Sequence, residues 1–341
     1  MENSFDIIII GGGPGGYKTA TYAASKGLTV LVVEKAELGG TCLNCGCIPT
    51  KTYARNAEII QTLKEADVYG LDELSFSFNF KTAYERKNNV IDALRNGIST
   101  LLSAPGITVV KGEAVLKSAS SVSVNGEEYS AKNIIIATGS ESKTLPIAGL
   151  DADMICDSIW LLSTDTLPKR ICIVGAGVIG MEFASILNSF GCEVSVVEFL
   201  KECLPALDGD IAKRLRKCLE KRGVAFYMQS GLKSAAKGKV VFEKKGKETE
   251  LETEKVLLAV GRKPNVEGLG LDEVGIAYDK KGITVTDMMQ TSVPGVYAIG
   301  DVNGRQMLAH AAEMQGKRAV NSILGLQDDI RFEIMPAAIF T

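Results

Sequence analysis

Residues 5–16 read FDIIIIGGGPGG. The apolar run Ile7–Ile10 ends directly in glycines, which is typical of a buried strand in a parallel sheet. The glycines match the pattern G-x-G-x-x-G, and the residues after them predict a helix and then a strand over Leu28–Val33. That strand closes on Glu34, which lies 23 residues after Gly11. Together these features predict a dinucleotide site, with the pyrophosphate on the helix N-terminus and the carboxylate on the ribose hydroxyls.

The same pattern occurs a second time between residues 170 and 198. Arg170–Val174 predicts a strand, residues 175–180 read GAGVIG, and Glu198 again lies 23 residues after the first glycine, Gly175. Two copies with one glycine-to-acid distance are very unlikely by chance. The sequence therefore predicts an α/β protein with two Rossmann-like, three-layer dinucleotide-binding domains.

We expect the second domain to be inserted in the first. The strand predicted at residues 296–300 delivers Asp301 to a turn, and a helix is predicted over Leu308–Ile323, so the chain is expected to return to the first domain near residue 267. The first domain is therefore expected over residues 1–148 and 267–331, and the second over 149–266. Residues 330–341 predict an apolar strand with nothing after it, which favours a truncated chain, and residues 332–341 are expected to be the stub of a missing C-terminal dimerisation domain.

Composition restricts the kinds of partner. The chain has 341 residues, 46% hydrophobic and 23% charged, with a net charge of −3, so we expect no nucleic-acid or membrane partner. The apolar runs are too short to span a bilayer, and the start, Met1–Ser4, lacks the basic segment of a signal peptide. We therefore expect a cytoplasmic protein, in which most of the eight cysteines are reduced and any disulfide is catalytic.

Residues 39–51 read GGTCLNCGCIPTK. Pro49 suits the first turn of a helix, so Cys47 is expected at a helix N-terminus, where the dipole favours a thiolate, and Cys42 on the loop before it. We interpret Cys42 and Cys47 as a redox disulfide. The residues leave two free thiols as an alternative, and Cys42 also forms a C-x-x-C pattern with Cys45. A zinc site would need four ligands, and the only histidine is His310, so no metal is expected.

Together with the two glycine motifs, this segment resembles the flavin-dependent disulfide reductases of the pyridine nucleotide–disulfide oxidoreductase family, and within them the dihydrolipoamide dehydrogenases. The resemblance runs from about residue 5 to the last residue and lacks the C-terminal dimerisation domain of that family. It implies FAD on the first glycine motif and NAD on the second. It also implies that Cys42 exchanges with the substrate, dihydrolipoamide on a lipoyl carrier domain or protein, and that Cys47 faces the flavin.

The resemblance assigns residues to each cofactor. Those implied for FAD are Gly11, Gly13, Pro14, Gly15, Gly16, Glu34, Lys35, Gly40, Thr41, Cys42, Lys51, Gly112, Ala114, Thr138, Gly139, Ser140, Asp301, Met307, Leu308, Ala309 and His310. Those implied for NAD are Gly175, Gly177, Val178, Ile179, Gly180, Glu182, Glu198 and Gly261. Glu198 favours NAD over NADP, because a carboxylate accepts from the 2′-hydroxyl and repels a 2′-phosphate.

Lys51 and Glu182 are expected to form an ion pair beside the flavin and to tune its electronics. With Cys42 and Cys47 they complete the expected catalytic residues. The other five cysteines show no pairing pattern and are expected to be packing residues; they are Cys156, Cys172, Cys192, Cys203 and Cys218.

The resemblance also sets an expectation for activity. The family's acid–base pair, a histidine and a glutamate of the C-terminal domain, has no counterpart here, and His310 matches a position beside the flavin instead. We therefore expect NADH to reduce the flavin, the disulfide and dyes, with lipoamide turnover impaired. Full-length family members homodimerise, whereas this chain is expected to be monomeric or weakly associated.

Two other readings remain as alternatives. One is a protein similar to the short thioredoxin reductases, whose redox pair lies as C-x-x-C in the pyridine-nucleotide domain; residues 149–266 contain no such pair. The other is a non-catalytic nucleotide-binding protein.

Overall fold

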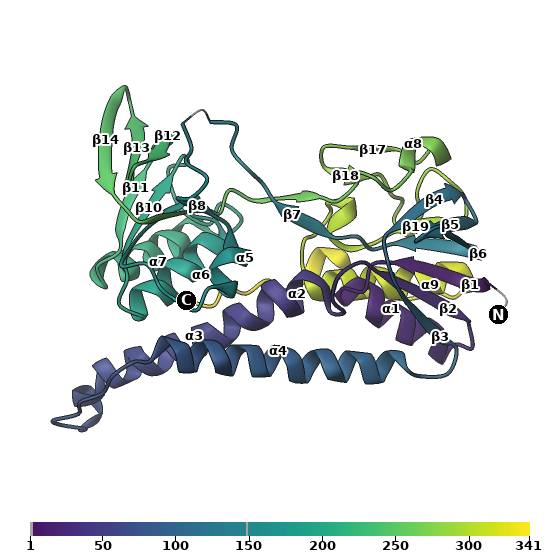
Figure 1. Ribbon diagram of the computed structural model, residues 1–341, viewed down its shortest axis with the longest axis horizontal. Helices are drawn as coiled ribbons and strands as arrows, with labels where there is room; N and C mark the ends of the chain where they lie inside the picture. Colours follow the sequence, from purple (N-terminus) through teal and green to yellow (C-terminus); the bar gives the residue numbers. More distant parts are fainter. Residues whose placement is uncertain (1–2, 148) are drawn as a thin grey trace. The chain divides into compact units, whose positions relative to one another are not determined.

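The computed structural model describes residues 3–147 and 149–341 (Figure 1). Residue 148, where the sequence predicts a domain boundary, lies outside these ranges, as do Met1 and Glu2 of the N-terminal segment that lacks the basic character of a signal peptide. The chain forms two units of α/β structure, each with its own sheet, in agreement with the predicted fold class. Within the described ranges, no helix has both the length and the apolar character that crossing a membrane requires.

The first unit comprises Met1–Asn44, Ile91–Glu141 and Lys263–Ala337. Its seven-stranded sheet has the order β3-β2-β1-β6-β5-β4, and β19 pairs with β6. Strands β3, β2, β1, β6 and β19 are parallel to one another. Strand β5 pairs antiparallel with β6, and β4 pairs antiparallel with β5. The strand bounds are β1 Ser4–Ile10, β2 Val30–Glu34, β3 Ile107–Lys111, β4 Ala114–Ser118, β5 Ser121–Val124, β6 Glu127–Ile136 and β19 Val296–Ala298.

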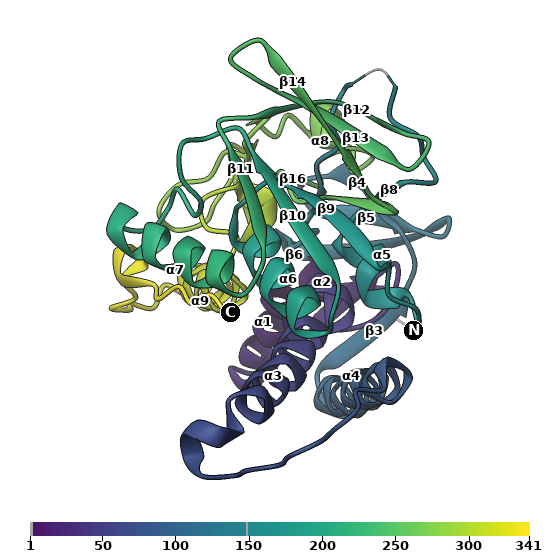
Figure 2. The same ribbon diagram turned by 90° about the vertical axis from the view of Figure 1, so that its left-hand side faces the viewer.

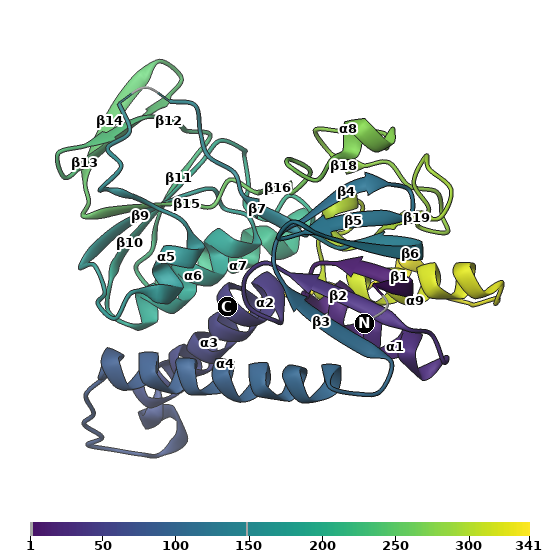
Figure 3. The same ribbon diagram turned by 45° about the vertical axis from the view of Figure 1, so that its right-hand side comes forward.

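The apolar run of β1 lies at the centre of this sheet, with β2 on one side and β6 on the other. Ile7, Ile8 and Ile9 are fully buried, as the sequence predicts for a central parallel strand. Helices α1 (Pro14–Ser25) and α9 (Ala309–Leu324) lie side by side on one face of the sheet (Figures 1 and 3). The smaller elements are α8 Leu271–Val274, β17 Tyr278–Asp279, β18 Gly282–Ile283 and the 3-10 helices Gly300–Asn303 and Phe332–Ile334.

The second unit comprises Cys45–Val90, Ser142–Arg262 and Ala338–Thr341. Its parallel five-stranded sheet has the order β11-β10-β9-β15-β8, and the antiparallel strands β12, β13 and β14 form a separate sheet (Figure 2). The strand bounds are β8 Ile155–Cys156, β9 Arg170–Val174, β10 Glu193–Glu198, β11 Ala225–Met228, β12 Gly231–Ala236, β13 Lys239–Lys244, β14 Lys247–Glu252 and β15 Lys255–Leu258. The helix bounds are α3 Cys47–Lys64, α5 Ser158–Ser163, α6 Val178–Ser189, α7 Gly209–Lys221 and the 3-10 helix Ala66–Tyr69.

Three elements lie across the division between the units. They are helix α2 (Gly40–Cys45), helix α4 (Phe80–Leu102) and the two-stranded sheet of β7 (Ser140–Ser142) with β16 (Arg262–Pro264). The division also differs from the expected domains, because residues 45–90 group with the second unit. Helix α3 packs there on α6, with the rings of Tyr53 and Phe190 edge to face at 5.7 Å and Gln61 Nε2 donating to Ser189 Oγ at 3.0 Å. Which domain holds which cofactor stays a prediction.

Two further expectations fare differently. No strand forms over residues 330–341, so the predicted strand is wrong; a 3-10 turn at Phe332–Ile334 is followed by an irregular segment. Pro336 lacks the N–H that a strand needs, which accounts for the interruption. Four of the five cysteines expected to pack are buried, namely Cys156, Cys172, Cys192 and Cys203, but Cys218 on α7 is exposed, so the expectation is wrong there.

A buried lysine in the second unit makes stability depend on pH. Lys87 on α4 is 3% exposed, and its Nζ donates to Leu162 O at 2.5 Å and lies 4.3 Å from the centroid of the Tyr84 ring. Burial lowers the pKa of Lys87 to about 8. Above pH 8 the folded state therefore releases a proton that the unfolded state keeps up to its higher pKa, so the free energy of unfolding rises with pH in that window.

We expect this rise to disappear in Lys87→Met. Between pH 7 and pH 9.5 the unsubstituted protein should gain about 1–2 kcal/mol of unfolding free energy relative to the variant. Urea unfolding of both proteins at the two pH values measures the difference. Equal pH dependence in both proteins would contradict the assignment.

Candidate functional site

The first glycine turn joins β1 to α1, and its conformation requires glycine at two positions. Gly11 has a φ of +112°, and a Cβ there would lie 2.3 Å from Ala137 O. A Cβ at Gly16 would lie 1.8 Å from Gly11 O. These glycines therefore fix the path of the turn and the packing of α1 on the sheet.

The second glycine turn, between β9 and α6, repeats this geometry. Gly175 has a φ of +105°, and its Cβ would lie 2.5 Å from Ala259 O. A Cβ at Gly180 would lie 2.0 Å from Gly175 O. The repeat thus extends to the carbonyls that face each turn, Ala137 O and Ala259 O, which the sequence analysis did not identify although both precede an x-Gly pair.

A third glycine in each turn is not required by the packing of the protein itself. Gly13 and Gly177 are the N-cap residues of α1 and α6, and neither helix has a side-chain cap. A Cβ at Gly13 would have its nearest neighbour at 3.8 Å, and one at Gly177 would meet nothing within 4 Å. The N-termini of both helices therefore have no side-chain cap and have open space beside the cap residue, so each turn fits a pyrophosphate group.

A carboxylate closes each turn in the same way. Glu34 accepts from Gly12 N at 2.6 Å and from Ala36 N at 2.8 Å, and Glu198 accepts from Ala176 N and Leu200 N, both at 2.6 Å. A carboxylate offers about four lone-pair sites, so two sites in each acid are left for ribose hydroxyls. Both acids therefore also fix the loops on which a nucleotide would rest.

The implied flavin residues of β7 and the Gly300–Asn303 turn lie together in the first unit. Ser140 Oγ donates to Asp301 Oδ2 at 2.5 Å. The turn that carries Asp301 is held by Gln315 on α9, whose Oε1 accepts from Gly300 N at 2.7 Å and from Asn303 Nδ2 at 2.8 Å. Sequence reasoning missed Asn303 and Gln315, because a buried amide carries no motif of its own.

Other implied flavin residues lie at strand ends and at the start of α9. Asn265 holds Thr138, donating to its carbonyl at 3.0 Å and accepting from its hydroxyl at 2.8 Å. His310 Nε2 lies 2.8 Å from Pro336 O. Lys35 forms an exposed ion pair with Glu113 at 3.4 Å. The remaining members are placed as follows: Gly112 directly after β3, Ala114 as the first residue of β4, Met307 and Leu308 just before α9, and Ala309 as its first residue. Gly261, which is implied for NAD, follows β15 with a φ of +104°.

The cysteine segment consists of two helices. Cys42 lies in the short helix α2, not on a loop as expected, and Cys47 is the first residue of α3, which begins two residues earlier than the predicted start at Pro49. The reason is Gly46, which serves as the N-cap of α3 and whose carbonyl accepts from Thr50 N at 3.1 Å. Cys47 therefore does lie at a helix N-terminus.

All three cysteines of the segment are half-buried. Burial raises the pKa of the Cys45 thiol, against the opposing charge of Arg262. Cys45 is thereby disfavoured as a thiolate, which is the reactive form. The segment begins against the first glycine turn, because a Cβ at Gly40 would lie 2.7 Å from Gly13 Cα.

Lys51 and Glu182 do not form the predicted ion pair within 4.0 Å. Phe340 contacts both: Lys51 Nζ lies 4.6 Å from the centroid of its ring, and Glu182 Oε1 accepts from its N–H at 2.9 Å. Burial raises the pKa of Glu182, while the Phe340 N–H and the charge of Lys51 act in the opposite direction. The two charges therefore interact in the second unit without direct contact.

No group of three or more His, Cys, Asp or Glu residues that could hold a metal ion occurs in the described ranges.

The structure thus combines two glycine turns that have matched acids with a cysteine segment at a helix start, in an α/β fold of the dinucleotide-binding type. The chain belongs to the pyridine nucleotide-disulphide oxidoreductase family, whose model matches residues 5–316. It is therefore an oxidoreductase, and the cofactors of its family are FAD and NAD.

Relatives of known name agree with this assignment. A dihydrolipoyl dehydrogenase of Acholeplasma laidlawii is 42% identical over 329 residues, which cover 95% of this chain and 97% of that protein. One of Mycobacterium tuberculosis (strain ATCC 25618 / H37Rv) is 40% identical over 334 residues, covering 95% of this chain and 72% of that protein. Among solved structures, the HOCl-induced flavoprotein disulfide reductase RclA from Escherichia coli has a TM-score of 0.84 at 30% identity, covering 95% of this chain and 72% of that one.

Proposed function

We propose that this chain acts as an NAD-dependent dihydrolipoyl dehydrogenase, which oxidises a dithiol through a Cys42–Cys47 disulfide. The observation that carries the proposal is the position of the cysteine segment. It begins at Gly40, packed against Gly13 of the first glycine turn, so Cys42 lies two residues after the point where the segment meets a dinucleotide cradle. The names of the relatives support dihydrolipoamide, carried on a lipoyl domain or protein, as the dithiol.

The proposed sulfur chemistry is a thiol–disulfide exchange in two steps. One thiolate of the substrate attacks Cys42 Sγ, the Cys42–Cys47 bond breaks, and Cys47 leaves as a thiolate. The second thiolate of the substrate then attacks the substrate sulfur of this mixed disulfide, Cys42 leaves as a thiolate, and the substrate departs as a cyclic disulfide. Two electrons are thereby left on the cysteine pair. FAD, when bound, supplies the carrier that links this pair to the pyridine nucleotide.

Helix α3 favours this exchange by stabilising the leaving group. Cys47 occupies its first position, where no side chain caps the helix and the N-terminal partial positive charge stabilises a thiolate. The substrate thiols also need a base, and the only histidine of the sequence, His310, contacts Pro336 O. We propose that dithiol turnover by these residues alone is therefore about 10²–10⁴-fold slower than it would be with a positioned general base.

The central test is anaerobic addition of NADH to the purified flavoprotein. We expect the flavin to bleach and the cysteine pair to appear as new thiols. A colourless protein that takes up no FAD would favour the non-catalytic alternative. A flavoprotein whose thiol count does not change with NADH would contradict the proposed sulfur chemistry.

NAD specificity is the second part of the proposal and rests on Glu198. This carboxylate is 8% exposed and is fixed at the end of β10 by two backbone N–H groups, where a 2′-phosphate would bring a second negative charge against it. Because such a juxtaposition costs several kcal/mol, we expect NADH to exceed NADPH by roughly 10² or more in kcat/KM for dye reduction. Steady-state rates with the two nucleotides measure the ratio.

Glu34→Gln serves as the matched control for Glu198→Gln, since both acids bridge the same backbone groups of their turns. Glu198→Gln should reduce the preference for NADH, whereas Glu34→Gln should weaken flavin retention and leave that preference unchanged. Equal kcat/KM with NADH and NADPH in the unsubstituted protein would refute the specificity.

A further inference from the structure

The helix that carries Cys42 is too short to be stable by itself. Helix α2 has six residues, whereas isolated helices of fewer than about 12–15 residues are marginal in water. Of its six residues, only Leu43 is buried. The position of the Cys42 sulfur therefore depends on polar contacts that hold α2 to the rest of the first unit.

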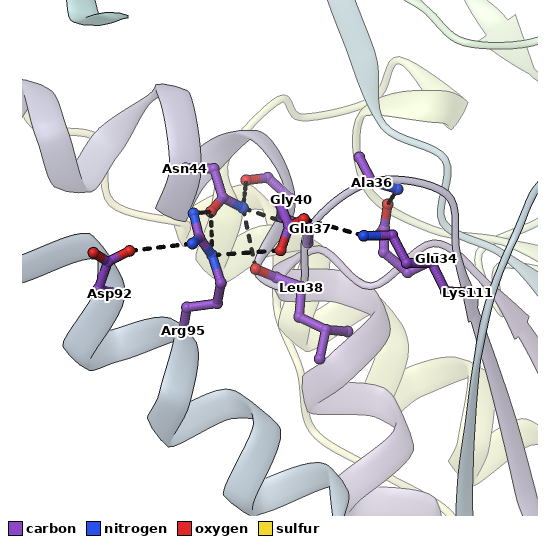
Figure 4. Close-up of polar contacts among 9 residues, drawn as sticks. All are labelled: Glu34, Ala36, Glu37, Leu38, Gly40, Asn44, Asp92, Arg95 and Lys111. Carbon is purple, nitrogen blue, oxygen red and sulfur yellow. Dashed lines mark hydrogen bonds and ion pairs between the residues drawn. The ribbon is translucent and has the colours of Figure 1, made fainter. Parts of the chain in front are cut away.

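Asn44 provides most of these contacts (Figure 4). Its Nδ2 donates to Gly40 O at 3.0 Å, to Leu38 O at 3.1 Å and, at a longer 3.3 Å, to Glu37 O. One side chain thus ties the end of α2 to its own first residue and to the segment that leads into it. Because Asn44 lies two residues after Cys42, these bonds fix the turn on which Cys42 lies.

Arg95 on α4 completes the set from a distant part of the chain. Its Nε and Nη2 donate to Asn44 Oδ1 at 3.1 and 2.8 Å, so the amide oxygen receives a forked donor pair. The guanidinium also forms ion pairs with Asp92, at 3.1 Å, and with Glu37, at 3.8 Å, and Lys111 lies 3.2 Å from the same Glu37. With these bonds both ends of the Asn44 amide are satisfied.

We infer that Asn44 and Arg95 are positioning residues that hold the Cys42 thiol in place for disulfide formation and thereby set the stability of the Cys42–Cys47 disulfide. Neither residue is assigned a role in either cofactor site, and neither needs to touch substrate or cofactor. The inference rests on the proposed function, in that it takes Cys42 as one half of the redox pair.

The direction of the effect follows from chain entropy. In the oxidised state the disulfide itself restricts the segment, whereas in the dithiol state only noncovalent contacts do so. Loss of the Asn44 contacts therefore frees the dithiol state more than the disulfide state. The effective concentration of one thiol at the other falls, and the disulfide becomes easier to reduce.

The experiment equilibrates the holoprotein in dithiothreitol redox buffers and counts the alkylated thiols by mass. Asn44→Ala and Arg95→Leu should each lower the equilibrium constant for disulfide formation about tenfold, which is about 30 mV for a two-electron couple. Arg95→Lys should restore part of the loss, because one ammonium can donate but cannot form the fork. Asp92→Asn is the matched control on the same helix, since it leaves both bonds to Asn44 in place, and its equilibrium constant should be unchanged.

Equilibrium constants equal to that of the unsubstituted protein in both Asn44→Ala and Arg95→Leu would overturn the inference, even where unfolding free energies fall. Should Asn44→Ala fail to fold, the two Arg95 variants still test the inference. The equilibrium constant for disulfide formation should then be lowest in Arg95→Leu, intermediate in Arg95→Lys and highest in the unsubstituted protein. Failure of the proposed function has a different signature, namely an unsubstituted protein in which oxidation joins no pair of thiols at positions 42 and 47.

Discussion

Cys47→Ser should yield a protein in which NADH generates no new thiols, while NADH-dependent dye reduction persists. The serine hydroxyl can neither form the disulfide nor leave as a stabilised anion at the start of α3, so electrons can no longer pass between the cysteine pair and the flavin. The two glycine turns are unchanged in this variant. The rate at which a dithiol reduces the flavin should fall by roughly 10⁴-fold or more, as when the nucleophile of a covalent mechanism is removed. Cys42→Ser should give the same loss.

Cys45→Ser is the matched control. Cys45 lies in the same segment and is equally half-buried, but burial raises the pKa of its thiol, and it has no step in the proposed exchange. Thiol counts after NADH, stopped-flow traces of flavin reduction by dihydrolipoamide and dye assays measure all three variants. Full loss of thiol appearance in Cys45→Ser, with normal behaviour in Cys47→Ser, would move the redox pair to Cys42 and Cys45.

A second large effect is expected at the glycines that cap the two cradle helices. A Cβ at Gly177 meets nothing within 4 Å, and the φ of −75° suits alanine, so Gly177→Ala should fold with an unfolding free energy within about 0.5 kcal/mol of the unsubstituted protein. The methyl group would nevertheless occupy open space at the uncapped N-terminus of α6, which we propose binds the pyrophosphate. We expect the affinity for NADH to fall by roughly 10² or more, equivalent to about 3 kcal/mol of overlap.

The same change at Gly13 should cost flavin retention instead, because the two turns share one geometry. Gly209→Ala is the control, since its Cβ also meets nothing within 4 Å and it lies at the start of α7, outside both turns. Gly180→Ala differs in kind, because its Cβ would lie 2.0 Å from Gly175 O and must disturb the fold. Fluorescence titration with NADH and absorbance of bound flavin separate these cases. Normal NADH affinity in Gly177→Ala would show that this turn does not bind the pyrophosphate.

The parts of the structure that could be predicted are those governed by local sterics. The strand–glycine–helix units follow from glycines whose Cβ atoms would collide with a backbone carbonyl, and such a constraint is visible in one stretch of sequence. The turn at Asn125-Gly126 has a similar local cause, because Asn-Gly favours a tight hairpin and both residues have the positive φ that such a turn requires, 53° and 87°. Matched spacing from Gly11 to Glu34 and from Gly175 to Glu198 then places both acids.

What could not be predicted depends on contacts between distant residues. Arg95 lies 51 positions after Asn44 in the sequence. The apolar periodicity of helix α4 predicts which side of the helix is buried, but it does not predict that Arg95 on this helix binds the side chain of Asn44. The grouping of α3 with the second unit depends on an aromatic contact between Tyr53 and Phe190. Lys51 and Glu182 each contact Phe340, the one through its ring and the other through its N–H, and Phe340 lies 158 positions after Glu182 in the sequence.

Gly12 has both of its backbone polar groups in use. Its N–H donates to Glu34, and its carbonyl accepts from Gly39 N at 2.9 Å, three residues before Cys42. The first glycine turn and the loop that leads to the cysteines thus meet at one residue, whose N–H and carbonyl lie in two successive peptide planes. A side chain at residue 12 would press on Leu38 at 3.0 Å and on Glu34 at 3.1 Å. A substitution at Gly12 would therefore alter the first glycine turn and the position of the Cys42 sulfur together.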